Sequence, residues 1–351
     1  MNSARPETAP LRPRHRPALK LVKTTDLSRE SWLEVRQGGI GSSDAAAALG
    51  LNPYKSQLTL WLEKTGRDTG LPQVDPNDEA SPMYWGTLLE PIVAAHYTKR
   101  TGRRVRRVNA VLQHPDFPWM LANLDREVMG VADVQILECK TAGLHGERLW
   151  RDGVPEYVVL QVMHQLAVTG KAAADVAVLL CGQELQVHRI TRDEGVIARL
   201  IELERRFWAH VVQDIAPPAD GSDSADSALR ALFPKDDGHT LDLRWDGDMA
   251  RTFSDLVAVR AKLADYEAQE AVLKQRIQQR MGVATLATFE TGRVKFKRSQ
   301  DGTQLDLPRL IQANPDLAAR YTTVKPGSRR FLVQMNDSHD GGCHGNGQDQ
   351  V

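Results

Sequence analysis

The stretch Val134-Gln135-Ile136-Leu137-Glu138-Cys139-Lys140 places a glutamate and a lysine two residues apart in an otherwise apolar run. Its Val, Ile and Leu content, with the turn glycine Gly130 before it, predicts a buried strand. Side chains two apart on a strand point to the same side, so Glu138 and Lys140 should emerge together. A buried carboxylate is costly unless a cation neutralises it. The stretch therefore indicates either a metal-dependent phosphodiester hydrolase or a structural Glu–Lys ion pair without chemistry.

Composition sets the broad class of protein. The chain has 351 residues, 41% hydrophobic and 26% charged, which is ordinary for a globular protein with one large core or a core plus an appended unit. Cys139, Cys181 and Cys343 form no CxxC pair, which argues against a disulfide framework and a four-cysteine zinc or iron–sulfur site. No apolar run approaches the ~20 residues of a membrane span, and no signal peptide is recognisable. We therefore expect a cytoplasmic, soluble protein.

Five segments follow one another along the chain. We expect a disordered basic arm over 1–25, a core over 26–213, a linker over 214–246, a long helix with a small α/β unit over 247–334, and a disordered tail over 335–351. Within the core, the order α, β-hairpin, α, β-hairpin, α predicts an α/β (α+β) fold with a mixed sheet and helices on its faces.

Two β-hairpins and their neighbouring helices define that core. The first hairpin should pair strands near 119–128 and 132–140, and the second should pair 174–181 with 185–190. A helix near 155–169 should separate the hairpins and end at Gly170. A capping box of Thr191 and Glu194 should open a long helix that reaches about Val212.

A phosphodiesterase needs carboxylates to hold one or two Mg²⁺ ions, a positioned water and charge neutralisation in the transition state. Glu138 is the first candidate ligand, and Asp125 on the preceding strand could face it across one metal. The backbone carbonyl of Cys139 adds a hard oxygen between the two charged residues. Lys140 would orient the water or hold the scissile phosphate.

Other polar residues near this stretch have more than one interpretation. Asp133 and Glu127 are alternatives to Asp125, although a solvated hairpin position is the simpler explanation of each. Glu90 lies on a helix with one apolar side and, taken alone, is an ordinary surface glutamate. Gln161 and Gln165 are four residues apart and share a helix face, where their amides could hold water or phosphate.

Five separated motifs together resemble a known family. They are Arg36–Asp44 (RQGGIGSSD), Gly86–Pro91 (GTLLEP), Asp125, Glu138–Lys140 (ECK) and Gln161–Leu166 (QVMHQL). In this order they resemble the YqaJ-type viral recombinases, which are phage and prophage exonucleases of the PD-(D/E)XK superfamily related to lambda exonuclease. The resemblance spans about residues 30–212. It implies a restriction-endonuclease-like mixed central sheet flanked by helices, with a helical and small β appendage at the C-terminal end.

The resemblance also implies roles for individual residues. Asp125 and Glu138 would be metal ligands, Lys140 the catalytic lysine, Glu90 a supporting acid, and Gln161 the glutamine of the last core helix. Arg36, Ser42 and Ser43 would hold the 5′ phosphate of the digested strand, since a guanidinium forks to phosphate and a helix start supplies donors. One departure stands out: Leu124 and Arg126 flank Asp125 where the family usually has proline and glycine. This departure leaves Asp133 open as the first ligand.

The implied activity is that of a Mg²⁺-dependent DNA exonuclease, with Mn²⁺ able to substitute. It would act 5′ to 3′ on double-stranded ends and make single strands for phage-type recombination in a bacterial host. A ring-shaped homo-oligomer and a single-strand annealing or single-strand binding partner would accompany it. A structure- or sequence-specific endonuclease on the same core is one alternative. A DNA-binding recombination scaffold whose nuclease core has decayed is another.

Nucleic-acid binding requires local positive charge, because the formal net charge is zero. The densest basic run comprises Lys99, Arg100, Arg103, Arg104, Arg106 and Arg107. In a nuclease Arg103, Arg104 and Arg106 would track phosphates, whereas in another protein the run would be a solvated face. Lys295, Lys297 and Arg298 form a smaller cluster in the C-terminal region.

Overall fold

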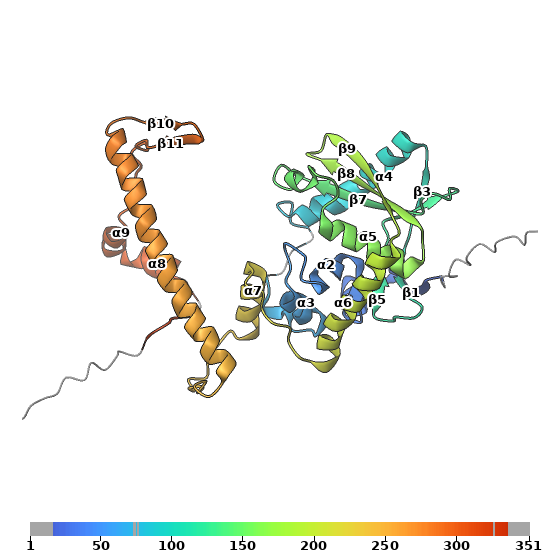
Figure 1. Cartoon of the computed structure of the whole chain (residues 1–351), viewed down its shortest axis with the longest axis horizontal. Coiled ribbons are helices and arrows are strands. Elements are labelled where there is room, and N and C mark those ends of the chain that lie inside the picture. Colours follow the sequence, from blue (N-terminus) through green and yellow to red (C-terminus); the bar gives the residue numbers. More distant parts are fainter. Residues whose placement is uncertain (1–16, 73–74, 76, 326, 336–351) are drawn as a thin grey trace, which may run out of the picture. The chain divides into compact units, whose positions relative to one another are not determined.

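The computed structural model describes residues 17–72, 75, 77–325 and 327–335. The chain forms two compact units, one ending at Pro234 and the other beginning at Lys235 (Figure 1). No helix among these residues is both long enough and apolar enough to cross a bilayer.

A five-stranded mixed sheet forms the centre of the first unit. Its order is β3-β6-β7-β8-β9, and only β7 and β8 run parallel. The strands are β3 (Arg104–Arg107), β6 (Arg126–Met129), β7 (Ile136–Ala142), β8 (Ala173–Leu180) and β9 (Glu184–Thr191). Because parallel neighbours need a crossover, helix α5 (Glu156–Thr169) connects β7 to β8. This is the predicted mixed sheet.

A second sheet, which the sequence did not reveal, lies in the same unit. It has four strands in the order β1-β4-β5-β2. They are β1 (Leu19–Lys23), β4 (Ala110–Gln113), β5 (Met120–Ala122) and β2 (Ile40–Gly41). The predicted strand over 119–128 is therefore wrong as a single element: its first half is β5 in this sheet, and its second half is β6 in the other. Asp125 lies between the two halves.

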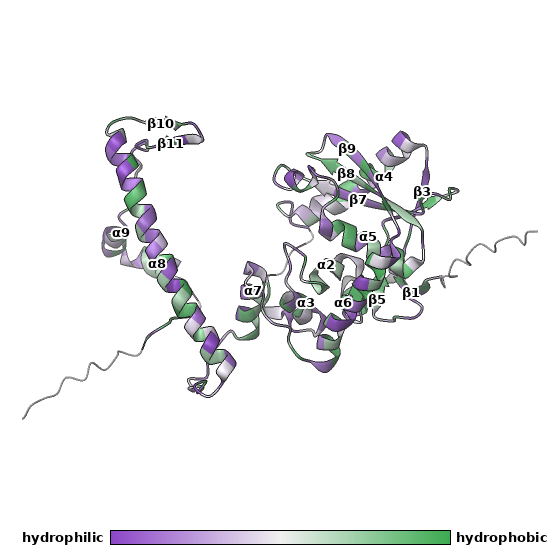
Figure 2. Ribbon diagram, in the orientation of Figure 1, coloured by the Kyte–Doolittle hydropathy of each residue, from purple (hydrophilic) through white to green (hydrophobic). Residues whose placement is uncertain are grey.

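Helices α4 (Pro82–Thr101) and α5 cover opposite faces of the five-stranded sheet. On β7, Ile136 packs in the cluster that contains α5, whereas Leu137 packs with Val93 and Tyr97 of α4. The alternation of strand side chains explains this split. Figure 2 shows α5 and β8 mainly green, as expected for elements buried in the core. Glu138, two residues from Ile136, therefore faces α5.

Of the remaining α-helices of this unit, the first two contact strand β2 of the four-stranded sheet, and the others pack against neighbouring helices. They are α1 (Arg29–Gln37), α2 (Ala45–Ala48), α3 (Gln57–Lys64), α6 (Glu194–Gln213) and α7 (Asp223–Leu232). Helix α5 ends as predicted at Gly170, which has the left-handed φ of 67° that glycine adopts without strain. The predicted capping box of α6 is wrong, because Asp193 supplies the cap by accepting from the Val196 amide at 3.0 Å. Thr191 is still part of strand β9.

Two predicted boundaries of the core are also wrong. The basic arm was expected to reach residue 25, but β1 pairs with β4 in an ordered sheet, while residues 1–16 lie outside the described part. The linker was expected over 214–246, but α7 falls inside it and packs on α3. Ser224 of α7 accepts from the Ser56 amide at 2.9 Å, and Ala228 is fully buried. The first unit therefore extends past the predicted end of the core.

The second unit contains the predicted long helix, α8 (Gly247–Met281), and a hairpin of β10 (Leu286–Phe289) and β11 (Gly292–Lys295). After the hairpin the chain forms helices α9 (Leu307–Ala313) and α10 (Pro315–Tyr321), with a break between them. Pro315 causes the break, because proline lacks the amide that would continue α9. Residues 331–333 form neither a helix nor a strand. Of the predicted tail, 336–351 lie outside the described residues.

Candidate active site

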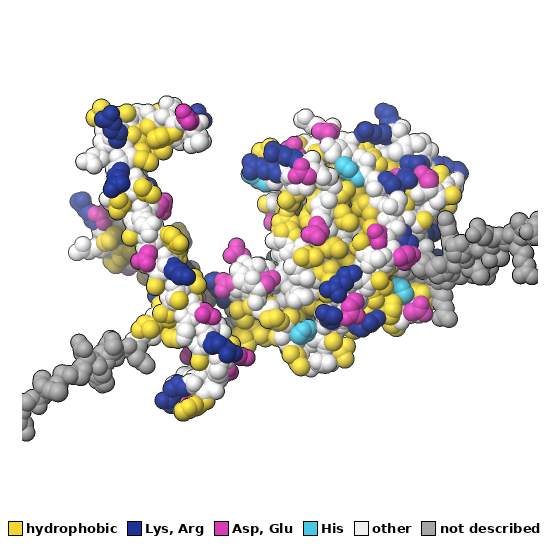
Figure 3. Space-filling model, in the orientation of Figure 1, with side chains coloured by type: hydrophobic (Ala, Val, Ile, Leu, Met, Phe, Trp, Pro, Cys, Tyr) yellow, Lys and Arg dark blue, Asp and Glu magenta, His cyan; other side chains and the backbone are white. Residues whose placement is uncertain are grey.

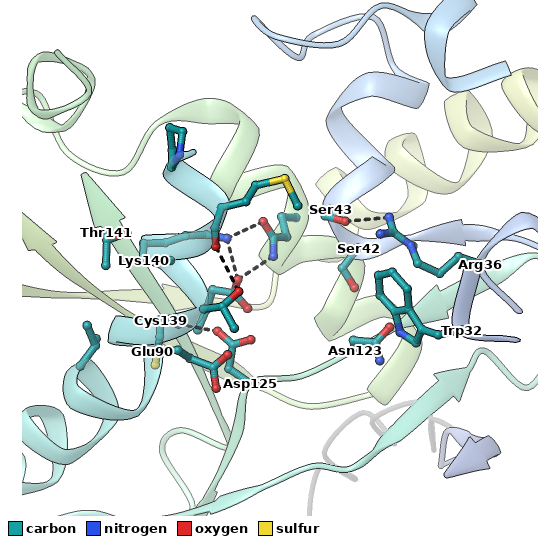
Figure 4. A pocket seen from close by; sticks show the side chains of 18 residues that line it. Trp32, Arg36, Ser42, Ser43, Glu90, Asn123, Asp125, Cys139, Lys140 and Thr141 are labelled. Carbon is teal, nitrogen blue, oxygen red and sulfur yellow. Dashed lines mark hydrogen bonds and ion pairs between the residues drawn. The ribbon is translucent and has the colours of Figure 1, made fainter. Parts of the chain in front are cut away.

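A pocket of about 420 Å³ opens in the first unit where α1, α4, α5 and β7 approach one another (Figure 4). Its walls include Asp125, from the link between the two sheets, and Glu138 to Thr141 of β7. The other lining residues are Trp32, Arg36, Gly41, Ser42, Ser43, Pro82, Met83, Gly86, Thr87, Glu90, Val93, Asn123 and Gln161. The structure thus brings together the predicted catalytic residues with Arg36, Ser42 and Ser43.

Glu138 is held from three directions. Its side chain is buried, and its Oε1 accepts from Lys140 Nζ at 2.7 Å and from Gln161 Nε2 at 2.6 Å. Its Oε2 accepts from Gln165 Nε2 at 2.7 Å. Gln161 and Gln165 can both reach it because they are one helical turn apart on the face of α5 turned towards β7. The Glu–Lys pair predicted from the strand is therefore present.

Gln161 links the two charged residues of the strand. Its amide nitrogen donates to Glu138, and its amide oxygen accepts from Lys140 Nζ at 2.9 Å. Burial lowers the pKa of Lys140, but the neighbouring Glu138 carboxylate outweighs that effect and raises the pKa above its usual range. Lys140 is thus a fixed positive charge in the pocket, suited to stabilising anions rather than accepting protons.

Asp125 lies beside Glu138 and Lys140, in surroundings that disfavour the ionised form of its own carboxyl group. Burial, followed by the charge of Glu138, raises the pKa of Asp125 to about 8. The Cys139 amide donates to Asp125 Oδ2 at 2.8 Å and partly offsets the rise. Two carboxyl groups placed this close together create a site where a cation would be stabilised.

The donor set fits a hard divalent cation. Asp125, Glu138 and the carbonyl of Cys139 supply oxygens, and Mg²⁺ commonly uses one or two carboxylates while keeping several waters. Among the described residues, no group of three or more His, Cys, Asp or Glu side chains is placed to hold a metal. Oxygen donors suit a hard cation rather than a soft metal such as zinc, whose structural sites use sulfur and nitrogen ligands.

Arg126, the residue that departs from the family pattern, has a defined position. Its guanidinium forms an ion pair with Glu90 and donates to the carbonyl of Asp125 at 2.7 Å. Both contacts are shielded, since Arg126 is itself buried. The substitution therefore fixes the Glu90 carboxylate beside Asp125, and the predicted supporting acid lies in the pocket next to the predicted ligand.

The opposite end of the pocket is positively charged. Arg36 donates to Asp44 at 2.9 Å and to Ser43 Oγ at 3.2 Å, and its guanidinium stacks 4.8 Å from the Trp32 ring centre. In Figure 4, Arg36, Trp32, Ser42 and Ser43 lie together, across the pocket from Lys140 and Thr141. The Ser42 hydroxyl is buried and has no hydrogen-bond partner among the described residues. An unsatisfied hydroxyl next to a guanidinium suits a small anion.

Asp44 would neutralise Arg36 if it were the only charged neighbour. Lys64, however, donates to Asp44 Oδ2 at 2.8 Å and to the Arg36 carbonyl at 2.8 Å. Burial opposes ionisation of Asp44, but Arg36 and Lys64 outweigh it and hold the pKa of that carboxyl well below its usual range. With two cations around one carboxylate, this end of the pocket keeps a net positive charge.

Several predicted alternatives lie elsewhere. Asp133 pairs with Arg103 at 2.9 Å and with Arg189 at 3.0 Å and does not line the pocket, so the prediction that it might replace Asp125 is wrong. Glu127, the other alternative, pairs with Arg106 at 2.6 Å, also outside the pocket. The carboxylates therefore partly neutralise Arg103 and Arg106 of the predicted phosphate track.

Arg104, the third residue of that predicted track, is different. Its side chain is exposed on β3 and has no ion pair within the described part of the chain. Phosphate binding by Arg104 stays a prediction.

The sequence indicated no role for Lys64 or Trp32, and for Gln165 it indicated water or phosphate binding rather than the observed hydrogen bond to Glu138. Gln165 carried a signal, because it is four residues after Gln161 on the same helix. Lys64 and Trp32 carried none, since nothing in their local pattern distinguishes them from ordinary helix residues. Lys64 contacts Asp44 in the 3-10 turn before α2, and Trp32 stacks on Arg36 within α1, so only the folded chain shows their place beside the pocket.

Comparison with known proteins identifies the family of this chain. A model of the YqaJ-like viral recombinase domain matches residues 31–172. The uncharacterized protein YqaJ of Bacillus subtilis (strain 168) is 35% identical over 321 residues, covering 90% of this chain and 97% of that protein. The chain therefore belongs to the YqaJ-like viral recombinase family, as the motifs predicted.

Two solved structures are similar to about half of the chain. An alkaline exonuclease (LHK-Exo) from Laribacter hongkongensis is 25% identical, with 53% of this chain and 94% of that chain covered and a TM-score of 0.44. A phage-related exonuclease from Haemophilus somnus 129PT is 10% identical, with coverage of 50% and 96% and a TM-score of 0.36.

Proposed function

We propose that this protein is a Mg²⁺-dependent DNA exonuclease that digests double-stranded ends from 5′ to 3′ and prepares single strands for phage-type recombination. The observation that carries the proposal is the linked set of Glu138, Gln161 and Lys140 beside Asp125, in one pocket with a positively charged far end. Membership of a viral recombinase family supports the same conclusion.

The residues have distinct roles in this proposal. Asp125, Glu138 and the Cys139 carbonyl would hold Mg²⁺, which when bound polarises the scissile phosphate and activates water. Gln161 orients Glu138 through the hydrogen bond between them. Lys140, whose pKa is raised, remains charged and stabilises the negative charge that develops on the phosphate.

The far end of the pocket would hold the terminal 5′ phosphate. Arg36 supplies the guanidinium, while Ser43 and the unsatisfied Ser42 hydroxyl supply further donors. Holding the terminal phosphate at a fixed distance from Glu138 would select ends over internal positions, because an internal nucleotide lacks that group. This arrangement favours an exonuclease over an endonuclease on the same core.

The test is digestion of end-labelled linear duplex beside closed circular duplex, with Mg²⁺ or with EDTA. The wild type should degrade only the linear DNA and only with Mg²⁺, and Glu138→Gln should lose that activity. Glu127→Gln is a matched control, because Glu127 lies on the neighbouring strand outside the pocket. Cutting of the circle would replace the proposal with an endonuclease. DNA binding without cleavage under any divalent ion would replace it with a scaffold.

A further inference from the structure

The hairpin end of the second unit is strongly basic. Within residues 271–300 there is a single acidic residue, Glu290, and seven basic residues. The basic residues are Lys274, Arg276, Arg280, Arg293, Lys295, Lys297 and Arg298. In Figure 3, dark-blue side chains appear at the end of α8 that leads into the β10–β11 hairpin. A net excess of this size over thirty residues contrasts with the neutral chain as a whole.

Few of these charges are neutralised by neighbouring carboxylates. Lys274 lies 3.6 Å from Glu270, and Arg298 lies 2.5 Å from Asp301. The other five basic residues form no ion pair within the described ranges of the chain. This differs from the basic run after α4, where Arg103 and Arg106 are paired with acids.

The strand geometry places part of this charge on one face. Arg293 and Lys295 lie opposite Thr288 and Leu286, whereas the half-buried Val294 lies opposite Ala287 on the other face. The pairing continues past β11, because the Phe296 amide donates to the Thr285 carbonyl at 2.9 Å. Alternate residues from Arg293 onward are therefore spaced ~7 Å apart along an exposed edge, comparable to successive phosphates of a nucleic-acid strand.

The same segment forms a shallow hollow of about 420 Å³. Its lining consists of Lys295, Lys297, Arg298, Ser299 and Gln300, so three cations and two neutral hydrogen-bonding side chains surround it. No carboxylate lines it. This chemistry suits phosphate oxygens, which accept from ammonium, guanidinium, hydroxyl and amide groups.

We propose that the β10–β11 hairpin is a second DNA-binding site, which holds the phosphodiester backbone without reading sequence. The choice of DNA as the ligand rests on the proposed nuclease function; the site itself rests on the charges and the hollow. Its binding is electrostatic and accompanied by counterion release, so it weakens steeply as salt rises. The hairpin therefore binds DNA independently of the pocket that contains Glu138.

The experiment measures DNA binding by the full-length protein in EDTA, so that cleavage plays no part. Fluorescence anisotropy is recorded with a labelled duplex and with a labelled single strand across a range of salt concentrations. The test variant carries Arg293→Gln, Lys295→Gln and Lys297→Gln. The control variant carries Lys262→Gln, Arg309→Gln and Arg320→Gln, which remove the same charge from exposed positions of the same unit.

The test variant should bind at least roughly tenfold more weakly, and its salt dependence should fall by about 2–3 in log–log slope, since each phosphate contact contributes ~0.9 on duplex and ~0.7 on single strands. A loss on duplex alone, or on single strands alone, identifies which form the hairpin holds. Equal losses of DNA affinity in the test and control variants would show that only net charge matters and would overturn the proposal. Unchanged DNA affinity in the test variant would also overturn it.

Failure of this inference is distinguishable from failure of the proposed nuclease. Cleavage abolished by Glu138→Gln, with binding unchanged in the hairpin variant, would keep the nuclease and remove the second site. DNA binding that depends on the hairpin, without Mg²⁺-dependent cleavage, would support the second DNA-binding site and contradict the proposed nuclease function.

Discussion

Lys64 lies 2.8 Å from the buried carboxylate of Asp44, and Arg36 approaches the same carboxylate from the pocket side. The Asp44 carboxylate therefore forms ion pairs with two cations, and Arg36, the cation that borders the pocket, is not fully neutralised. The arrangement fixes the Arg36 side chain while leaving positive charge for an incoming anion. Lys64 affects a ligand in the pocket only through Asp44 and Arg36, so it is a positioning residue.

Replacing this lysine should weaken selection for a 5′ phosphate. In Lys64→Met, Asp44 neutralises Arg36, so KM for 5′-phosphorylated duplex should rise about tenfold with kcat little changed. Digestion rates on 5′-phosphorylated and 5′-hydroxyl duplexes give the measurement. Lys64→Arg should retain most of the discrimination, and Lys55→Met, at a more exposed pair with Glu63, is the control. Equal losses on both substrates would show that Lys64 only supports the fold.

Gln161 should matter for turnover more than for binding. Gln161→Leu removes the amide that links Glu138 to Lys140, so both side chains lose part of their fixed orientation. We expect kcat to fall about 100-fold, as for small misplacements of catalytic groups, with DNA affinity in EDTA unchanged. The exposed turn variant Gln183→Leu should behave as wild type. A variant that loses affinity but keeps kcat would contradict this role.

Arg126 and Glu90 should be energetically coupled. A double-mutant cycle with Arg126→Gln and Glu90→Gln, followed by urea unfolding, should give a coupling free energy of about 1–3 kcal/mol, because the pair is shielded from water. Additive effects of the two substitutions would show that their ion pair contributes nothing to stability. The matched cycle is Arg205 with Glu202, an exposed pair expected to give below ~1 kcal/mol.

His164 should make stability depend on pH. Both ring nitrogens face acceptors, Glu204 Oε1 at 2.7 Å and the Leu121 carbonyl at 2.9 Å, so the imidazolium is the form that fits. Burial lowers the pKa of His164, but Glu204 and the hydrogen bonds outweigh it and raise the pKa above 6.5.

The sign of the pH effect follows from this raised pKa. The stabilisation is complete below the unfolded value of 6.5 and is lost as pH rises through the folded pKa. Urea unfolding from pH 5.5 to 9 should show this loss in the wild type. The difference between wild type and His164→Gln isolates it from other histidines. A difference that does not vary with pH would mean that folding leaves the pKa of His164 unchanged, and a difference that grows with pH would mean that the folded ring stays neutral.

Mg²⁺ should stabilise the first unit through Asp125. A cation relieves the unfavourable proximity of Asp125 and Glu138, so saturating Mg²⁺ should raise the melting temperature by roughly 2–4 °C for each kcal/mol of binding free energy. Asp125→Asn should lose this shift, and Asp133→Asn, at a paired residue outside the pocket, should keep it. An Asp125→Asn protein that retains the shift would place the ion elsewhere.

Local patterns in the sequence were sufficient for much of the catalytic centre. Strand β7 was predictable from its apolar run, and the same-side placement of Glu138 and Lys140 follows from strand periodicity alone. Gln161 and Gln165 share a face of α5 for the equivalent helical reason. These residues depend on spacing within one element, which a sequence displays directly.

The four-stranded sheet and the boundaries of the first unit were not predictable in this way. Strand β2 has only two residues, and β1 pairs with a strand about ninety positions later, so neither produces a local signal. Asp133 was equally plausible as a ligand until its pairing with Arg103 and Arg189 was visible. Such contacts join segments far apart in sequence, and only the folded chain brings them together.

The position of Asp125 at the crossing between two sheets has a mechanical consequence. Helix α5 contacts both sheets at this point. His164 is hydrogen-bonded to the Leu121 carbonyl of β5, and Gln165 donates to the Asn123 carbonyl and to Glu138 of β7. The distance between Asp125 and Glu138 therefore depends on how the two sheets are placed relative to each other, and α5 sets that placement. Substitutions that shift this helix by a fraction of an ångström would disable the centre while leaving every one of its reactive groups in the chain.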